Sequence, residues 1–133
     1  MLLKQNPLRR LFKRLRSADP RHRLGAEGEK AARLFLEAAG YRFIARNVTT
    51  PFGELDLLMR DGECLVVVEV KVLHAAAALP AKLQVNRAKQ KHLRDSALYY
   101  IKAKRWTKSV RIDVMGRNGE QPFEHIKGAV PFG

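Results

Sequence analysis

The sequence predicts a single α/β domain in which a mixed β-sheet is flanked by helices. Three observations predict it: strand-like alternation over residues 41–73, helical periodicity on either side of that segment, and renewed alternation after residue 109. A chain of 133 residues with 46% hydrophobic residues is long enough to form one core. The predicted order is helix, three strands, helix and strand, followed by one further short strand.

The N-terminal segment differs from the rest of the chain. Apolar residues recur there at helical spacing with basic residues between them, and Asp19-Pro20 follows as a stop signal. The apolar residues are Leu8, Leu11, Phe12 and Leu15. We therefore expect a basic amphipathic arm at residues 1–23 and a folded domain at residues 24–133. The arm could dock on the domain, lie along nucleic acid or stay disordered until it binds.

Residues 25–40 predict the first helix of the domain. Gly40 is suited to end it, and the apolar face consists of Ala31, Leu34, Phe35 and Ala38. Glu27 and Glu29 fall in the first turn, where the helix dipole favours carboxylates. Position in the helix alone therefore explains both acids as helix-start charges.

Residues 41–73 predict three consecutive strands. Residues 41–47, 53–60 and 63–73 each alternate between apolar and polar side chains. Asp61-Gly62, between the last two, has the composition of a two-residue hairpin turn. We therefore expect an antiparallel hairpin with the first strand beside it, and the valine-rich third strand at the centre of the sheet.

Three acids and one lysine gather on one face of this hairpin. With the turn at Asp61-Gly62, Glu54 would face Glu69, and Asp56 would be the diagonal neighbour of Glu69, roughly 7 to 8 Å away at the backbone. Lys71 shares their face. Because burying unpaired Glu69 and Lys71 would be costly, a hard divalent cation held by oxygen ligands would compensate. The alternative is a solvated polar pair on a half-exposed sheet.

Residues 74–81 predict a loop, in which a lone histidine, His74, is more often neither a ligand nor an acid/base residue. Residues 86–104 predict the second helix, with Ala97, Leu98, Tyr100 and Ile101 toward the sheet. Residues 109–115 predict a strand in which Arg111 and Asp113 form a surface salt bridge, and Asn118-Gly119 turns the chain into a last strand at residues 123–126.

The charge distribution indicates a polyanionic partner. The formal net charge is +13, with acids concentrated between Glu27 and Glu69 and bases on both flanks, which favours nucleic acid over a membrane. A single cysteine, Cys64, excludes an internal disulfide and fits a reducing cytoplasm. No stretch approaches the ~20 apolar residues of a membrane span. We expect a cytoplasmic nucleic-acid-binding protein; the simpler alternative is a basic or ribosome-associated soluble protein.

Two motifs carry a family resemblance. G-E-L-D-L-L at residues 53–58 followed by V-E-V-K at residues 68–71 resembles the acidic and E-x-K elements of the PD-(D/E)XK, or restriction-endonuclease-like, nuclease superfamily. With its surroundings the hairpin is similar to the small bacterial YraN family, over about residues 25–127. The resemblance implies a restriction-endonuclease-like core, an αβββαβ mixed sheet flanked by helices.

The resemblance also implies roles for individual residues. Asp56 and Glu69 would hold Mg²⁺ or Mn²⁺, while Lys71 would position or polarise the attacking water. Glu29 matches the glutamate of the G-x-x-G-E helix start and would be a ligand or contact a metal-bound water. Independently of the resemblance, Glu54, as the predicted cross-strand neighbour of Glu69, would support these ligands or be an extra one; the alternative is a surface acid near the turn.

The second helix would supply the contacts to nucleic acid. Lys89 and Gln90 match a lysine and a glutamine near the start of this helix in related nucleases, where they contact phosphate or the site. A basic helix face there is well placed to contact the substrate backbone. The remaining basic residues assigned to this surface are Arg87, Lys91 and Arg94.

The implied activity is metal-dependent hydrolysis of phosphodiester bonds, in DNA rather than RNA, with branched or repair intermediates as candidate substrates. Similarity to archaeal Holliday junction resolvases makes a homodimer a candidate assembly, by analogy only. The alternative is a non-catalytic nucleic-acid-binding module with a degenerate nuclease fold. It is favoured by Val72 and Leu73, which stand where relatives commonly have Thr or Arg followed by Arg.

Overall fold

The computed structural model describes residues 20–73 and 83–132. Residues 1–19 of the predicted arm lie outside the described residues, as does the predicted loop with His74. Helix α2 begins at Pro20 and therefore crosses the domain boundary predicted between residues 23 and 24. Within the described residues, no helix is long and apolar enough to cross a membrane.

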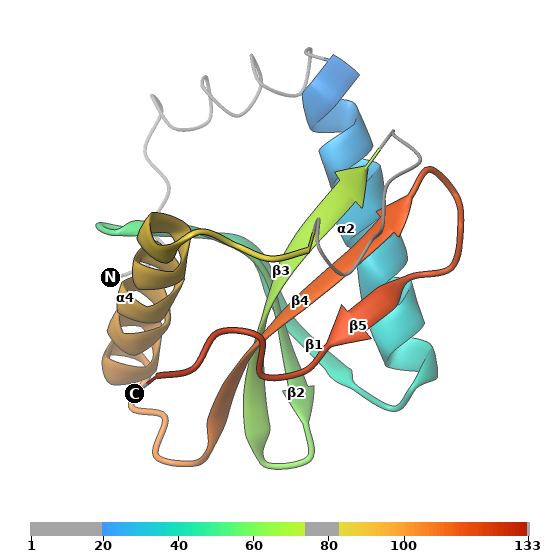
Figure 1. Ribbon diagram of the computed structural model, residues 1–133. Helices are drawn as coiled ribbons and strands as arrows, with labels where there is room; N and C mark the ends of the chain where they lie inside the picture. The colour runs from blue at the N-terminus through green and yellow to red at the C-terminus, as the bar shows by residue number, and fades with distance from the viewer. Residues whose placement is uncertain (1–19, 74–82, 133) are drawn as a thin grey trace, which may run out of the picture.

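A five-stranded mixed sheet lies between two helices (Figure 1). In chain order the elements are α2 (Pro20–Ala38), β1 (Arg42–Thr50), β2 (Gly53–Asp61), β3 (Cys64–Leu73), α4 (Arg87–Ala103), β4 (Val110–Asn118) and β5 (Glu124–Ile126). The strands follow the order β1-β2-β3-β4-β5; β3 and β4 are parallel and the other neighbours antiparallel. This is the predicted αβββαβ arrangement of a restriction-endonuclease-like core.

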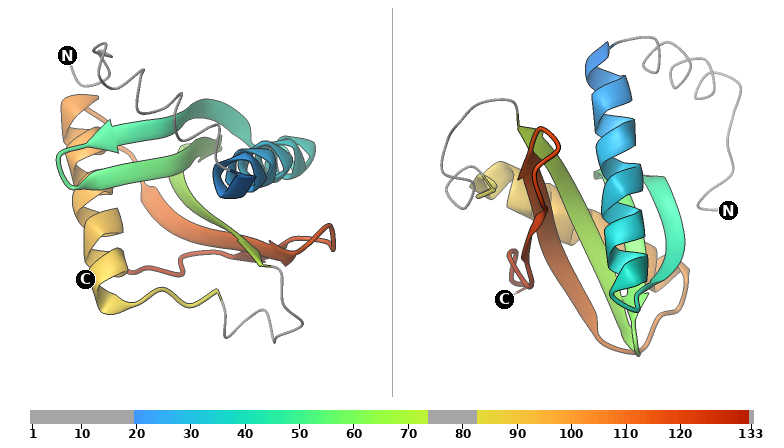
Figure 2. Two further views of the ribbon diagram at one scale, coloured as in Figure 1. Left: turned by 90° about the horizontal axis from the view of Figure 1, so that it is seen from above. Right: turned by 90° about the vertical axis from the view of Figure 1, so that its right-hand side faces the viewer.

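Helices α2 and α4 cover opposite faces of the sheet (Figure 2). Beneath α2, a buried cluster joins Ala32 and Leu36 to residues of β2, β3 and β4. Beneath α4, a second cluster joins Leu93, Ala97 and Tyr100 to the other sides of the same strands. Strand β3 is thus buried on both faces, which is why its sequence is a nearly continuous run of valines.

The buried face of α2 differs from the predicted one. Gly28, Ala32 and Leu36 are buried, whereas Leu34 is 57% exposed and Phe35 is 43% exposed. A Cβ atom at Gly28 would clash with Cγ2 of Val72, so the absence of a side chain lets α2 lie close against β3. The prediction failed because it followed the bulky apolar residues, while close packing of helix and strand selects small ones.

This close contact predicts opposite effects for two identical substitutions in α2. Gly25→Ala should stabilise the protein by up to about 1 kcal/mol, because alanine favours the helix and nothing lies within 4 Å of a Cβ there. Gly28→Ala should instead destabilise it by about 1 to 3 kcal/mol through overpacking against Val72. Urea unfolding of both variants measures the difference. Equal stabilisation by the two would contradict the packing described.

The β2–β3 hairpin turns one residue later than predicted. Asp61 pairs with Cys64, so the loop residues are Gly62 and Glu63, and Gly62 has φ +59°. The prediction of a turn at Asp61-Gly62 was wrong. A turn at Gly62-Glu63 also contains a glycine that can adopt the left-handed conformation, so the sequence is compatible with both turns. The pairs end at Leu57 with Val68, which brings Asp56 level with Glu69 and makes the predicted pairing of Glu54 with Glu69 incorrect.

Near Asp56, the side chains of β2 no longer alternate regularly between the two faces of the sheet. Leu55 and Leu58 both belong to the cluster beneath α4, although a regular strand would place them on opposite faces. Strand β1 is also irregular: its register shifts between Phe43 and Ala45, and Asn47 lies inside the strand with φ +51°. The sheet is therefore distorted on both strands that precede β3.

Helix α4 begins with an N-cap, and the residues that it buries differ in part from those predicted. The side chain of Asn86 accepts a hydrogen bond from Lys89 N at 2.8 Å and caps the helix. Ala97 and Tyr100 are buried as predicted, but Leu98 is 48% exposed. Leu93 takes the inward position that the sequence analysis assigned to Leu98.

Candidate functional site

Asp56 and Glu69 come together where β2 and β3 stop pairing. Asp56 Oδ2 accepts a hydrogen bond from Val70 N at 3.0 Å, so a carboxylate replaces the backbone carbonyl that a paired strand would offer. Glu69, from the neighbouring strand, is only 7% exposed. The distortion of β2 thus turns one acid toward the backbone of β3, beside a second, buried acid.

The electrostatics of this pair are unfavourable. Burial and then the charge of Asp56 raise the pKa of Glu69 to about 8, although Lys89 acts in the opposite direction. Burial also raises the pKa of Asp56, against the hydrogen bond from Val70 N. Glu69 Oε2 is buried and accepts no well-formed hydrogen bond among the described residues, although Lys89 Nζ lies 3.5 Å from it. Two adjacent buried acids form a place where a cation would be stabilised.

Two lysines flank the acid pair. Lys89 Nζ lies 3.5 Å from Glu69 Oε2, an ion pair whose lysine is 43% exposed. Lys71 Nζ donates a hydrogen bond to the backbone carbonyl of Gln84 at 3.0 Å. The contact between Lys71 and Gln84 was not foreseen, because any residue supplies a carbonyl and the sequence carries no signal for it. It joins β3 to the segment that precedes α4.

The other two predicted ligands are Glu54 and Glu29. Glu54 is partly buried on β2, and its charge contributes to the raised pKa of Asp56. Glu29 belongs to α2, on the opposite face of the sheet from α4. Across residues 20–73 and 83–132, no group of three or more His, Cys, Asp or Glu side chains is arranged to hold a metal ion. The structure therefore joins Asp56 to Glu69, and Glu29 as a third ligand stays a prediction.

The basic residues of α4 divide into two sets. Lys89 and Gln90 face the site and the segment before the helix, where Gln90 Nε2 donates to Val85 O at 2.9 Å. The other set, Arg87, Lys91 and Arg94, recurs at helical spacing on the outer side, and Lys91 pairs with Asp95 at 2.7 Å. This outer stripe is a basic surface of α4.

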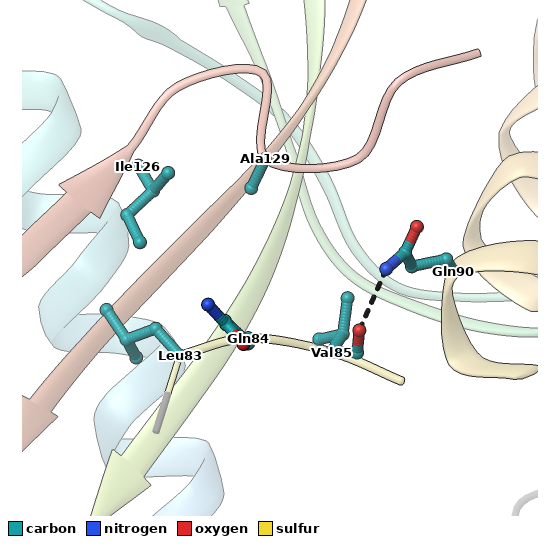
Figure 3. A pocket seen from close by; sticks show the side chains of 6 residues that line it. All are labelled: Leu83, Gln84, Val85, Gln90, Ile126 and Ala129. Atoms are coloured by element: carbon teal, nitrogen blue, oxygen red, sulfur yellow. Dashed lines mark hydrogen bonds between the residues drawn. The ribbon is translucent and has the colours of Figure 1, made fainter. Parts of the chain in front are cut away.

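A pocket of about 460 Å³ lies between the segment that precedes α4 and the end of β5 (Figure 3). It is lined by Leu83, Gln84, Val85, Gln90, Ile126 and Ala129. A Cβ atom at Gly116 would clash with Cδ2 of Leu83, one of the lining residues. The pocket could not be predicted from the sequence, because its walls come from three separate segments of the chain.

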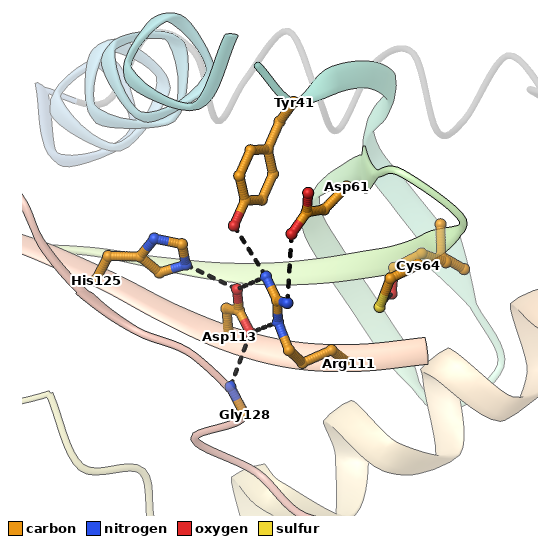
Figure 4. A network of polar contacts seen from close by, with 8 residues as sticks. Tyr41, Asp61, Cys64, Arg111, Asp113, His125 and Gly128 are labelled. Carbon is orange, nitrogen blue, oxygen red and sulfur yellow. Dashed lines mark hydrogen bonds and ion pairs between the residues drawn. The ribbon is translucent and has the colours of Figure 1, made fainter. Parts of the chain in front are cut away.

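A second polar cluster, centred on Asp113, is buried rather than exposed (Figure 4). Asp113 is 0% exposed and accepts hydrogen bonds from Arg111 Nε at 2.8 Å, Arg111 Nη2 at 3.0 Å and Gly128 N at 2.8 Å. His125 Nε2 lies 2.7 Å from its Oδ2. The predicted salt bridge with Arg111 is present, but its predicted surface position was wrong.

Every oxygen of Asp113 is satisfied. Burial alone would raise its pKa, but the hydrogen bonds from His125, Arg111 and Gly128 N lower the pKa below its ordinary value. Arg111 also donates to Tyr41 Oη at 3.0 Å, which links β4 and β5 to the chain just before β1. In contrast to the Asp56–Glu69 pair, this cluster needs no further cation and serves to hold the fold together.

Comparison with known proteins gives a consistent picture. A sequence model of the family described as "Uncharacterised protein family UPF0102" matches residues 28–116. A UPF0102 protein of Thermodesulfovibrio yellowstonii is 41% identical over 106 residues, covering 80% of this chain and 94% of the relative. One from Chloroflexus aurantiacus is 39% identical over 121 residues (84% and 95%), and one from Bordetella avium is 39% identical over 113 residues (81% and 78%).

Proposed function

This chain belongs to the uncharacterised protein family UPF0102, the YraN-like group indicated by its motifs, and we propose that it is a metal-dependent endonuclease acting on DNA. The observation that carries the proposal is the buried Asp56–Glu69 pair, in which two carboxylates adjoin and the nearby Lys89 Nζ lies 3.5 Å from Glu69 Oε2. A pair of this kind is costly unless a cation binds it, and pKa values perturbed by burial and a charged neighbour are typical of functional sites.

The residues present fit a hard divalent ion. Mg²⁺ is commonly held by one or two carboxylates, with water and substrate phosphate completing its coordination, so Asp56 and Glu69 would suffice as protein ligands. When bound, Mg²⁺ or Mn²⁺ would lower the pKa of a bound water and neutralise charge on the phosphate. Participation of Glu29 through a water molecule stays a prediction.

The protein's own side chains would position the reacting groups. Lys71 lies two residues beyond Glu69 on β3, where its ammonium group can orient the attacking water or stabilise charge on the phosphate. Lys89, next to Glu69 Oε2, can exchange that carboxylate for a substrate phosphate. Glu54 adds negative charge beside Asp56 and would strengthen attraction of the cation.

The substrate would be bound through its backbone. The outer stripe of Arg87, Lys91 and Arg94, together with the net charge of +13, supports attraction of a polyanion. DNA rather than RNA, and branched or repair intermediates among DNA substrates, follow from the family resemblance. A cytoplasmic location and a homodimer are proposed on the same ground.

Cleavage assays with and without metal test the proposal. The full chain would be incubated with supercoiled, duplex, single-stranded and branched DNA in EDTA, Ca²⁺, Mg²⁺ or Mn²⁺. We expect products only with Mg²⁺ or Mn²⁺, carrying free 3′ or 5′ ends that end-labelling identifies. Binding of these DNAs without any metal-dependent product would contradict the endonuclease proposal.

A non-catalytic nucleic-acid-binding module is the second candidate. The observation that favours it is the position of Lys89 Nζ, 3.5 Å from Glu69 Oε2, where a lysine already supplies positive charge to the acid pair. In such a module the salt dependence of DNA binding would remain. Isothermal titration with Mn²⁺ separates the two, because the module would show no heat of metal binding at this site.

Metal affinity should rise with pH. Because the pKa of Glu69 is raised to about 8, a proton occupies the acid pair below that pH and must leave before a cation binds. We expect apparent affinity for Mn²⁺ to increase about tenfold per pH unit between roughly pH 6 and 8 and then level off. Calorimetry in buffers of different ionisation heat should detect release of about one proton; an affinity independent of pH would contradict the site.

A further inference from the structure

The pocket beside α4 is connected to the acid pair by two short links. Gln84, which lines the pocket, accepts the hydrogen bond from Lys71 Nζ through its backbone carbonyl. Gln90, another lining residue, directly follows Lys89, whose ammonium group lies 3.5 Å from Glu69 Oε2. A nucleic-acid strand with one phosphate at the acid pair would therefore carry a neighbouring nucleotide past the mouth of the pocket.

We propose that this pocket receives a single unpaired nucleobase of the bound DNA strand, an inference that rests on the proposed function. The side chains of Val85, Ile126 and Ala129 offer apolar surface to the faces of a planar ring (Figure 3). The amides of Gln84 and Gln90 offer donors and acceptors to its edge. Apolar walls with a few fixed polar groups are the usual composition of a small-ligand site.

The hydrogen bonding and the size of the pocket agree with this occupant. Donation from Gln90 Nε2 to Val85 O, at 2.9 Å, fixes the amide and makes its Oε1 an acceptor of fixed direction. The volume of about 460 Å³ falls within the roughly 300 to 1,000 Å³ of typical ligand pockets and admits one nucleoside. A paired base is stacked within its duplex and cannot enter, so the pocket selects strands with an unpaired or extruded base.

Equilibrium binding with Ca²⁺ in place of Mg²⁺ tests the inference on the full chain. The probes are a fully paired fluorescein-labelled duplex and the same duplex with a single bulged 2-aminopurine. We expect the wild type to bind the bulged duplex about tenfold more tightly, and the 2-aminopurine fluorescence to change on binding.

Three variants test whether the preference for the bulged duplex depends on the pocket. Ala129→Trp fills the pocket and should remove most of the preference for the bulged duplex while leaving affinity for the paired duplex unchanged. Ala103→Trp is the matched control, because Ala103 is exposed at the far end of α4, and it should behave as the wild type. Gln84→Leu removes an amide but keeps the carbonyl that binds Lys71, and should weaken binding of the bulged duplex several-fold.

The outcomes are distinguishable from those of the proposed function. An equal affinity of the wild type for both duplexes, or an unchanged preference in both Ala129→Trp and Gln84→Leu, would overturn the base pocket. Cleavage of the same probes with Mg²⁺ by the wild type would leave the endonuclease proposal standing in that case. Thermal melts verify that each variant is folded.

Discussion

The Glu69→Gln variant is expected to lose Mg²⁺-dependent cleavage by a factor of about 10³ or more while its metal-free form becomes more stable at pH 8. The loss follows because an amide cannot replace a buried carboxylate as ligand of a divalent ion. The gain follows because a charged Glu69 is buried beside Asp56, a cost that the neutral amide avoids. Opposite changes of activity and stability would be the signature of a site built for a cation.

The sign of the stability change depends on pH. Because the folded-state pKa of Glu69 is raised from 4.5 to about 8, its contribution to stability declines as pH rises from about 4.5 through about 8. Glu69→Gln should therefore exceed the wild type by an amount on the order of 2 to 4 kcal/mol at pH 8, and the difference should shrink toward pH 5. Urea unfolding in EDTA across this pH range measures it.

Glu63→Gln is the matched control for that variant. Glu63 lies in the turn of the same hairpin, its side chain is 76% exposed, and it pairs with Lys108 at 2.8 Å. We expect its cleavage rate to be unchanged and its stability to change by less than about 1 kcal/mol. Full cleavage by Glu69→Gln would remove Glu69 from the catalytic assignment, whatever the stability data show.

The Asp113→Asn variant is expected to be destabilised by about 3 to 5 kcal/mol without direct loss of chemistry. Asp113 is fully buried, and the amide would point donor hydrogens at Arg111 or Gly128 N, both of which already donate to this position. It would also remove the charge that balances Arg111. Chemical unfolding measures the loss, and cleavage measured well below the melting temperature should remain.

A control variant and the pH dependence of stability make the prediction for Asp113→Asn specific. Asp95→Asn breaks the exposed pair with Lys91 and should cost less than about 1 kcal/mol. Since the pKa of Asp113 is lowered, its stabilisation is present above the unfolded value near 3.8 and lost as pH falls through the folded one. A difference between wild type and Asp113→Asn that vanished at pH 6 would contradict the network shown in Figure 4.

Much of the fold could be predicted from local patterns. The element order, the antiparallel hairpin and its polar positions follow from alternation and helical periodicity, which depend on each residue's own environment. Shifting the turn from Asp61-Gly62 to Gly62-Glu63 moves each pair by two positions in total and so preserves the faces of the paired residues, whereas Leu55 lies on the face opposite to the predicted one. The predicted proximity of Asp56 and Glu69 was therefore not affected by the error in the predicted register.

The remaining features depend on partners distant in sequence. Leu98 and Leu34 are as apolar as their buried neighbours, and only the approach of a helix to the sheet decides which side chain faces inward. Asp113 was assigned to the surface because a strand covered on both faces cannot be recognised from two charged residues. The contact of Lys71 with Gln84, and the pocket beside it, arise from backbone placement between separate segments.

The two edge strands of the described sheet are poorly suited to pairing with a strand of another molecule. A long, flat edge strand invites another chain to extend the sheet, and proteins resist this with bulges, charge and short edges. Here the β1 edge is interrupted at residues 43–45 and at Asn47, and carries Arg42 and Arg46, while β5 at the other edge has only three residues. A pair of these molecules would consequently have to join through helices or loops, and aggregation by strand addition is disfavoured from both sides.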